Sequence, residues 1–528
     1  MKTRNILYSA LLLLLSGLTF TSCDDYLDVM PDNRTVIDNE EKVKKLLTSA
    51  YAENTHVLFT EYMSDNVDEF PNTNTSRFLD QIYHWEDITE TNNESPERYW
   101  ESSYASATAA NMALEGIDKV GGATNTTLRE CKAEALLCRA YAHFMLVNIF
   151  SKAYNSKTSD KDLGIYYQYE TASKIGEVHD RGTVAEVYEK IDKDIQEALP
   201  LIGDTHYDVP KFHFNQKAAY AFAAKFYLYY EQWDKAIEYA NKCLGSAPRT
   251  MLRDWSYYTT LASNREAYTL HYVASELNCN LLLLTGYSVA GVAFGNWSSY
   301  KKYTHGPYTD SHETSKASNI WGDAEFYDGG TKPYTSTSAT YNIFWRLPYL
   351  FQYTDAVRGI GYYKTIYPAF TTDECLLNRA EAYIHKKNYD AAAADLTMWM
   401  QNIINTGMTL TPQSINDFYK PIAYSYDADG LSSTIKKHLH PTFEIGEEGS
   451  IDETMYQCLL GFRRIEQLET GQRWFDVKRF GIEILRRQMG ANGMPAKATD
   501  KLSVDDERRA IQLPQRVIDS GMTPNPRK

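Results

Sequence analysis

Between Lys217 and Pro248, apolar and small residues recur at intervals of three and four, which is typical of two consecutive amphipathic helices. Residues 231–234 interrupt this pattern and predict a tight turn between the helices. Pro248 lacks a backbone N–H group, so we expect it to end the second helix. The positions predicted to share a face are Tyr220, Ala223, Ala224 and Tyr227 in the first helix and Ala236, Ala240 and Cys243 in the second.

The pattern occurs again further along the chain with one constant shift in numbering. A third, weaker copy is predicted in residues 133–150, with Ala140 and His143 in the key places and a partner helix at about 184–199. The order of aromatic and small residues is similar to that of a tetratricopeptide repeat. Because one such hairpin cannot bury its apolar face alone, we predict a mainly α fold in which helical hairpins stack into a scaffold. The positions of the second copy are Leu376, Ala380, Tyr383, Tyr389, Ala392, Leu396 and Trp399.

Helical periodicity fades between residues 251 and 370, where Ser, Thr, Gly, Asn and aromatic residues become frequent. A stretch of this length without its own repeat predicts long loops and short strands inserted into the scaffold. Within it, residues 280–294 are apolar and predict a buried strand rather than a membrane segment. A second irregular, aromatic stretch is expected at residues 61–85.

The N-terminus has the pattern of a lipoprotein signal. Lys2 and Arg4 precede an apolar run over residues 6–20, and small residues then lead to Cys23. The alternative is a transmembrane helix, but that needs about 20 apolar residues, and this run is shorter and interrupted by polar residues. We therefore predict residues 1–22 to be a cleaved signal peptide and Cys23 to be the lipidated residue that holds the protein at a membrane.

Composition narrows the range of partners. The 528 residues carry a formal net charge of −15 without a basic stretch, so nucleic acid is a poor candidate. The 41 tyrosines and 9 tryptophans are an excess of flat side chains with a polar group, which suit a hydrated recognition surface. The cysteines after Cys23 lack metal-ligand spacing and predict buried thiols; they are Cys131, Cys138, Cys243, Cys279, Cys375 and Cys458.

Directly after Cys23 the chain reads DDYLDVMPDN, an acidic tether with a Tyr-Leu-Asp…Pro segment. This start resembles the SusD/RagB family of surface lipoproteins from Bacteroidetes. The chain departs from the family pattern at Phe462-Arg463, where Glu-Arg is usual, and at Thr470, where Glu is usual before Gly471. The resemblance continues, in the family's order and spacing, in residues 99–117, 132–150, 181–199, 217–248, 376–399, 463–481 and 512–527.

The resemblance implies a SusD-like protein in four parts. These are the signal peptide 1–22, an N-terminal helical-repeat region 23–250, a loop-rich aromatic ligand-binding region 251–370, and a C-terminal region 371–528 that completes the scaffold. It also implies a lipid-anchored position at the surface of the outer membrane. The implied partner is a SusC-like TonB-dependent transporter, on which the protein sits as a lid.

The sequence contains no recognisable catalytic motif. H-E-x-x-H, G-x-S-x-G, the P-loop and G-x-G-x-x-G are all absent, so we expect neither an enzyme nor a cofactor. His438 and His440 with Glu444 could ligate a metal, but a third ligand at suitable spacing is missing, and we interpret them as surface residues.

The segment 473–479 is rich in charge and could be mistaken for an anion site. Arg473, Asp476 and Arg479 are spaced three residues apart, which allows ion pairs along one helix face. We therefore predict a structural role for this segment, including its neighbours Trp474 and Lys478.

Aromatic residues interleaved with Asn, Asp and Arg have the chemistry that a sugar needs. Rings pack against the C–H face of a pyranose, while amide, carboxylate and guanidinium groups bond to its hydroxyls. The same surface suits a peptide, as in RagB-like proteins. A surface glycoside hydrolase and a purely structural assembly protein are further alternatives. A hydrolase would break down glycans, whereas a structural protein would bind no soluble ligand. The predicted ligand-binding residues are Trp255, Trp297, Trp321 and Trp345, faced by Asp65, Asn66, Arg77 and Trp85.

Overall fold

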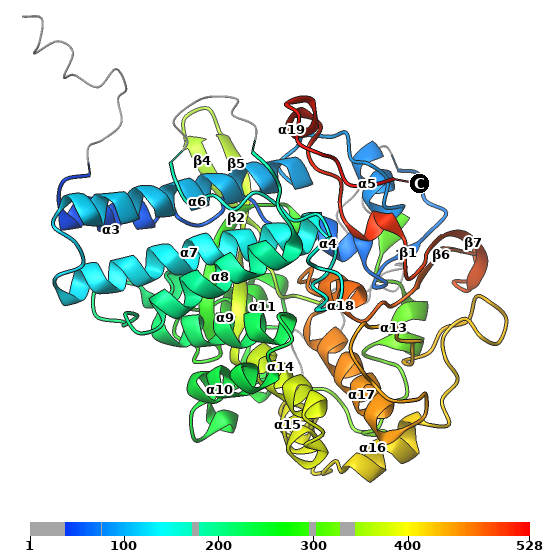
Figure 1. The fold of residues 1–528 in the computed structure, drawn as a ribbon. Helices are drawn as coiled ribbons and strands as arrows, with labels where there is room; N and C mark the ends of the chain where they lie inside the picture. Colours follow the sequence, from blue (N-terminus) through cyan, green and yellow to red (C-terminus); the bar gives the residue numbers. More distant parts are fainter. Residues whose placement is uncertain (1–36, 75, 172–178, 295–301, 328–343, 528) are drawn as a thin grey trace, which may run out of the picture. The chain divides into compact units, whose positions relative to one another are not determined.

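The computed structural model describes residues 37–74, 76–171, 179–294, 302–327 and 344–527. The predicted signal peptide, Cys23 and Trp297 lie outside these ranges. Helices predominate in the described part, which confirms the mainly α prediction (Figure 1). Two small sheets accompany them.

The helices of the N-terminal half are α3 (Glu40–Leu47), α4 (Val57–Met63), α5 (Arg77–Tyr83), α6 (Pro96–Lys119), α7 (Thr126–Phe150), α8 (Val184–Ala198), η1 (Pro210–Phe212), α9 (Gln216–Tyr229) and α10 (Trp233–Leu244). Those that follow are η2 (Pro248–Met251), η3 (Ser256–Thr260), α11 (Arg265–Tyr272), α12 (Ala290–Ala293), α13 (Pro307–Glu313), α14 (Thr372–His385), α15 (Tyr389–Ile403), α16 (Pro412–Tyr419), α17 (Ile451–Glu466), α18 (Arg473–Arg479), η5 (Glu507–Arg509) and α19 (Gln515–Asp519).

The predicted hairpins are present. α9 packs against α10, α14 against α15, and α7 against α8, while α10 also packs against α14 and so joins two hairpins (Figure 1). Ala224 and Ala380 are fully buried, which confirms the predicted register. Small side chains at these positions let the helix backbones approach closely.

The ends of these helices follow from local sequence. Asn215 caps α9 by accepting a hydrogen bond from the Ala218 N–H group, and Thr371 caps α14 in the same way. The prediction that Pro248 ends the second helix is wrong: α10 stops at Leu244, because Gly245 adopts the left-handed conformation with φ of 70°. Pro248 instead begins η2.

The first sheet has the strand order β2-β5-β4, with β2 (Asn280–Tyr287), β4 (Leu350–Asp355) and β5 (Ile360–Thr371) all antiparallel. The buried strand predicted at residues 280–294 is confirmed as far as Tyr287, after which α12 follows. The second sheet has the order β3-β1-β6-β7, with β1 (Asp68–Glu69), β3 (Tyr303–Thr304), β6 (Ile484–Met489) and β7 (Pro495–Leu502). Residues 61–85, which we expected to be irregular, contain the end of α4, strand β1 and helix α5.

The charged residues of α18 have a structural role, but not through pairs along one helix face. Arg473 bonds to Asp65, with Nε 2.9 Å from Oδ1. Asp476 accepts from Arg463 at 3.0 Å, and Arg479 bonds to Glu381 at 2.6 Å. The predicted intrahelical pairs are therefore wrong, because buried partners on α14, α17 and the segment after α4 take these charges instead.

The six described cysteines are all buried and free, as predicted. Burial raises the pKa of Cys138 and Cys458, so both are protonated near neutral pH.

Candidate functional site

A buried ion network ties the N-terminal and C-terminal parts of the chain together. Glu313, at the end of α13, lies 2.7 Å from the Lys437 ammonium, 2.8 Å from the Arg464 guanidinium and 3.0 Å from that of Arg487. Burial raises the pKa of Glu313, but the three cations outweigh burial and hold it well below its ordinary range. Asp65 extends the network by bonding to Arg473 and lying 3.4 Å from Arg464.

This network supports the loop of residues 425–438. Arg487, on β6, donates to the Leu431 carbonyl and the Ser433 hydroxyl. Asp429 closes the loop by accepting from the Ser432 hydroxyl and from the backbone N–H groups of Ser432 and Leu431, and these bonds lower the pKa of Asp429 to about 2. The tip of the loop is thus held both by Arg487 and by its own Asp429.

Tyr426, within this loop, has an unusual backbone conformation. Its φ is 75°, a left-handed conformation that is strained for a residue with a large side chain. Its hydroxyl accepts a hydrogen bond from Lys437 at 3.3 Å, and the Lys437 ammonium lies 4.7 Å from the ring centre. Strain of this kind is held only where the surroundings fix it, and such positions cluster at binding sites.

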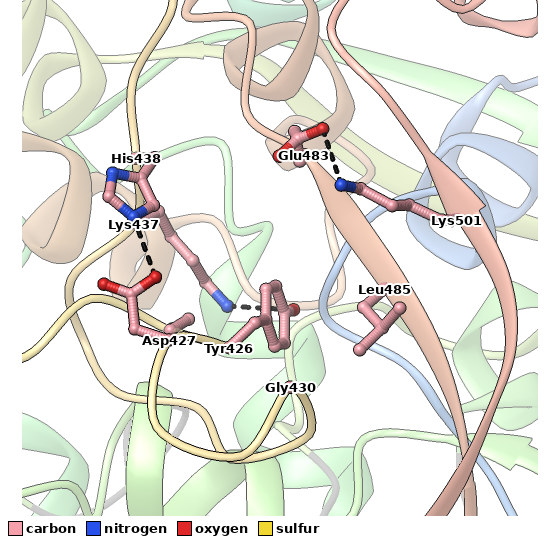
Figure 2. A pocket seen from close by; sticks show the side chains of 9 residues that line it. Tyr426, Asp427, Gly430, Lys437, His438, Glu483, Leu485 and Lys501 are labelled. Atoms are coloured by element: carbon pink, nitrogen blue, oxygen red, sulfur yellow. Dashed lines mark hydrogen bonds and ion pairs between the residues drawn. The ribbon is translucent and has the colours of Figure 1, made fainter.

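The loop faces the β6–β7 ribbon across a cavity of about 290 Å³ (Figure 2). Tyr426, Asp427 and His438 line the loop side. Leu485 and Lys501, which are cross-strand neighbours on β6 and β7, line the other side together with Glu483. This size is close to the lower end of the range for small-ligand pockets and suits one ring of a ligand rather than a long segment.

His438 is held between two carboxylates. Its ring bonds to Glu448 at 2.5 Å and to Asp427 at 3.1 Å, and it stacks on Tyr424 at 4.1 Å. Burial disfavours the charged ring, but the hydrogen bonds and the charges of Glu448 and Asp427 outweigh it and raise the pKa of His438. We therefore interpret His438 as a cationic donor that orients Asp427.

The pocket offers one aromatic ring and several polar groups of both signs. Lys501 pairs with Glu483 at 3.0 Å on the rim, as Asp427 pairs with His438 on the opposite side (Figure 2). Such a lining suits a neutral ligand with many hydroxyl groups, because each hydroxyl can both donate and accept. The His, Cys, Asp and Glu residues that the structure describes form no group of three that could hold a metal.

The predicted aromatic residues lie in different places. Trp255 and Trp321 are buried, with 1% and 5% of their surface exposed, and they pack against Tyr258 and Phe462 respectively. Trp345 is half-buried and connects to the Trp255 cluster through Tyr268, at 5.4 Å. Trp255 and Trp321 are therefore not the exposed rings that we expected, because they fill the interior. Ligand contact by Trp345 stays a prediction.

The four residues predicted to form the polar wall also differ in burial. Asp65 and Asn66 are buried, and both bond to Arg464 or Arg473 rather than facing solvent. Trp85 is also buried; its indole N–H donates to the Met63 carbonyl. Arg77 alone of the four is exposed, so ligand contact through its side chain stays a prediction.

Sequence reasoning missed Tyr426, Lys437 and Lys501. None belongs to a motif, and they come from a loop and a strand more than 60 residues apart. The signal that could have helped is the Asp429-Gly430 turn, since this pair predicts a tight loop that presents neighbouring side chains.

The chain has known relatives by sequence pattern and by fold. Residues 25–228 match the model of a SusD-like family described as starch-binding and associating with the outer membrane. A comparison with curated proteins gives no match.

Solved structures share the fold over most of the chain. A SusD superfamily protein from Bacteroides thetaiotaomicron VPI-5482 has a TM-score of 0.60 and 16% identity, covering 93% of this chain and 100% of that chain. A SusD-like carbohydrate-binding protein from Bacteroides vulgatus ATCC 8482 has a TM-score of 0.55 and 16% identity, covering 91% and 96%. A laminarin-binding SusD-like protein has a TM-score of 0.53 and 17% identity, covering 93% and 99%.

The scaffold of stacked helical hairpins is therefore the fold that these solved SusD-like structures share. The match over residues 25–228 and the shared fold make the chain similar to SusD-like proteins. In the part that the structure describes, no helix is both long enough and apolar enough to cross a membrane.

Proposed function

We propose that this protein captures an oligosaccharide or polysaccharide at the surface of the outer membrane and delivers it to a SusC-like TonB-dependent transporter. A lipid on Cys23 would hold it there. The observation that carries the capture step is the pocket between the 425–438 loop and the β6–β7 ribbon, with Tyr426 as its aromatic wall.

The pocket's chemistry supports a sugar ring. One face of a pyranose can pack on the Tyr426 ring, while Asp427, Glu483 and Lys501 can bond to its hydroxyls. The ion network beneath fixes the loop before ligand arrives, so less conformational entropy is lost on binding.

The proposed role is binding without turnover. Asp427 and Glu483 each have a cationic partner, at 3.1 and 3.0 Å. Both carboxylates are thus engaged in ion pairs before ligand arrives, and the sequence contains no recognisable catalytic motif. The purified protein should therefore leave the polymer intact.

Titration calorimetry with laminaritriose and maltotriose, and with laminarin and soluble starch, tests this function. Tyr426→Ala should weaken binding at least several-fold, because one stacked ring contributes about 0.5 to 1.5 kcal/mol beyond area burial. Tyr257→Ala is the control, since Tyr257 is an exposed tyrosine outside the pocket. Equal affinity of Tyr426→Ala and wild type would refute the pocket, and release of sugars would refute the binding-only role.

A further inference from the structure

The ribbon formed by β4 and the first half of β5 exposes an unusual number of large apolar side chains. Val357 at its tip is 98% exposed, Tyr353 60%, and Tyr362 and Tyr363 49% and 42%. Phe351 and Ile360 are exposed as well. A contiguous exposed patch of this kind marks an interaction site rather than a random surface.

One face of the ribbon has a continuous strip of rings, formed by Tyr349, Tyr363, Phe351 and Tyr353. Successive ring centres are 4.4, 4.9 and 4.8 Å apart. Phe351 and Tyr363 are cross-strand partners, so the strip follows from the strand register. Each ring holds the next, which reduces the rotamer freedom that a ligand would have to restrict.

Gly361 makes this strip possible. A Cβ atom at this position would lie 2.8 Å from the Phe351 ring and 2.1 Å from the Gln352 carbonyl oxygen. Any larger residue would therefore displace the Phe351 ring or break the pairing with β4. The glycine thus serves the aromatic surface rather than the turn, which Gly359 provides with its φ of 66°.

The opposite face of the ribbon carries polar groups beside its aromatic rings. Tyr287 and Tyr362 meet edge to face at 5.5 Å, and the Lys364 ammonium lies 4.5 Å from the centre of the Tyr287 ring. Gln352 is the cross-strand partner of Tyr362 and points to the same face. An amide and an ammonium beside tyrosine rings are hydrogen-bonding partners for sugar hydroxyls.

The ribbon is less suited to a lipid bilayer. In the β2-β5-β4 sheet, β4 is the edge strand, so within the described residues its outer backbone groups have no strand partner. Unsatisfied backbone groups are costly in hydrocarbon but not in water or against a hydroxylated ligand. Most rings of the ribbon are also tyrosines, which keep a polar hydroxyl at the surface.

We propose that the β4–β5 ribbon is a second glycan-contact surface, on which the rings of a polysaccharide chain stack, separate from the pocket at Tyr426. This inference rests on the proposed function, because it concerns the same class of ligand. It extends that function from one sugar ring in a pocket to several along a chain.

Native gel electrophoresis through laminarin or soluble starch tests it, together with calorimetry on laminaritriose and maltotriose. The double variant Tyr353→Ala/Tyr363→Ala should lose about tenfold or more in affinity for the retaining polysaccharide, as expected for two lost ring contacts. Its affinity for the trisaccharide should equal that of wild type. Tyr257→Ala is again the control, and an unchanged melting temperature checks that the variants are folded.

The outcomes separate the two proposals. If wild type and the double variant are retained equally, the ribbon proposal is overturned and the pocket stands. If the double variant loses polysaccharide and trisaccharide equally, the ribbon is not a separate surface and the proposal is also overturned. If wild type binds none of the four glycans, the proposed function fails, and the ribbon proposal fails with it. If the double variant is retained in the gel like wild type but no longer associates with a transporter, the ribbon is a protein-docking surface instead.

Discussion

Replacing Glu313 by glutamine should strongly destabilise the protein. The Glu313 carboxylate is fully buried, with three cations within 3.0 Å. Glutamine keeps the shape but removes the charge, which leaves Lys437, Arg464 and Arg487 undercompensated in the interior. Removal of one partner from a buried ion pair costs about 3 to 5 kcal/mol, and we expect a loss of that order in the free energy of unfolding.

Urea unfolding followed by circular dichroism measures this loss. Glu238→Gln is the matched control, because Glu238 pairs with Lys242 on the exposed face of α10, where a pair contributes about 0.3 to 0.5 kcal/mol. A loss below about 1 kcal/mol for Glu313→Gln would refute the argument that the network is held by charge.

The pH dependence gives a second, independent check. The pKa of Glu313 is lowered in the folded state, so its stabilisation is complete above the ordinary carboxyl value and is lost as pH falls from there toward the lowered value. The difference in stability between wild type and Glu313→Gln should therefore be constant from pH 7 down to about 4.3 and shrink as the pH is lowered further. A difference that does not shrink below about pH 4.3 would contradict the assignment.

Three further predictions concern the scaffold, the loop and the anchor. Ala224→Leu or Ala380→Leu should each destabilise the fold by about 1 to 3 kcal/mol through overpacking, and a neutral effect on urea unfolding would contradict the close helix contacts. Because the pKa of His438 is raised, charged His438 stabilises the pocket loop fully below about pH 6.5, and this stabilisation is lost as the pH rises through the raised value. Glycan affinity should therefore fall over that pH window in wild type but not in His438→Gln. A wild-type affinity that does not change over the window would contradict this role of His438. Cys23→Ala should yield a folded protein that no longer fractionates with membranes, so unchanged fractionation would argue against the lipid anchor.

The scaffold could be predicted from sequence because its determinants are local. The spacing of Ala224 and Tyr227 in α9, and of Ala380 and Tyr383 in α14, reports one buried face without reference to distant residues. The end of α10 was misplaced because a glycine C-cap at Gly245 acts before the proline does.

The pocket could not be predicted, because its position depends on contacts between distant segments. Tyr426 is presented by a loop that rests on Arg487, and Arg487 in turn depends on Glu313. Spacing along the chain carries no information on such pairings. Aromatic frequency was also misleading, since it does not distinguish Trp255, which is buried beside Arg253, from an open ring.

The ribbon did leave a local signal. Residues 349–364 read YLFQYTDAVRGIGYYK, in which rings recur on both sides of an Arg358-Gly359 turn. This arrangement predicts a hairpin with aromatic residues brought face to face. The general aromatic richness of residues 251–370 concealed it.

A crystal structure of the protein with a bound oligosaccharide of laminarin or starch would test the central claim most directly. We predict a sugar ring packed on Tyr426, with hydroxyls bonded to Asp427, Glu483 or Lys501 across the cavity of about 290 Å³. A ligand bound elsewhere, with this pocket empty, would contradict it.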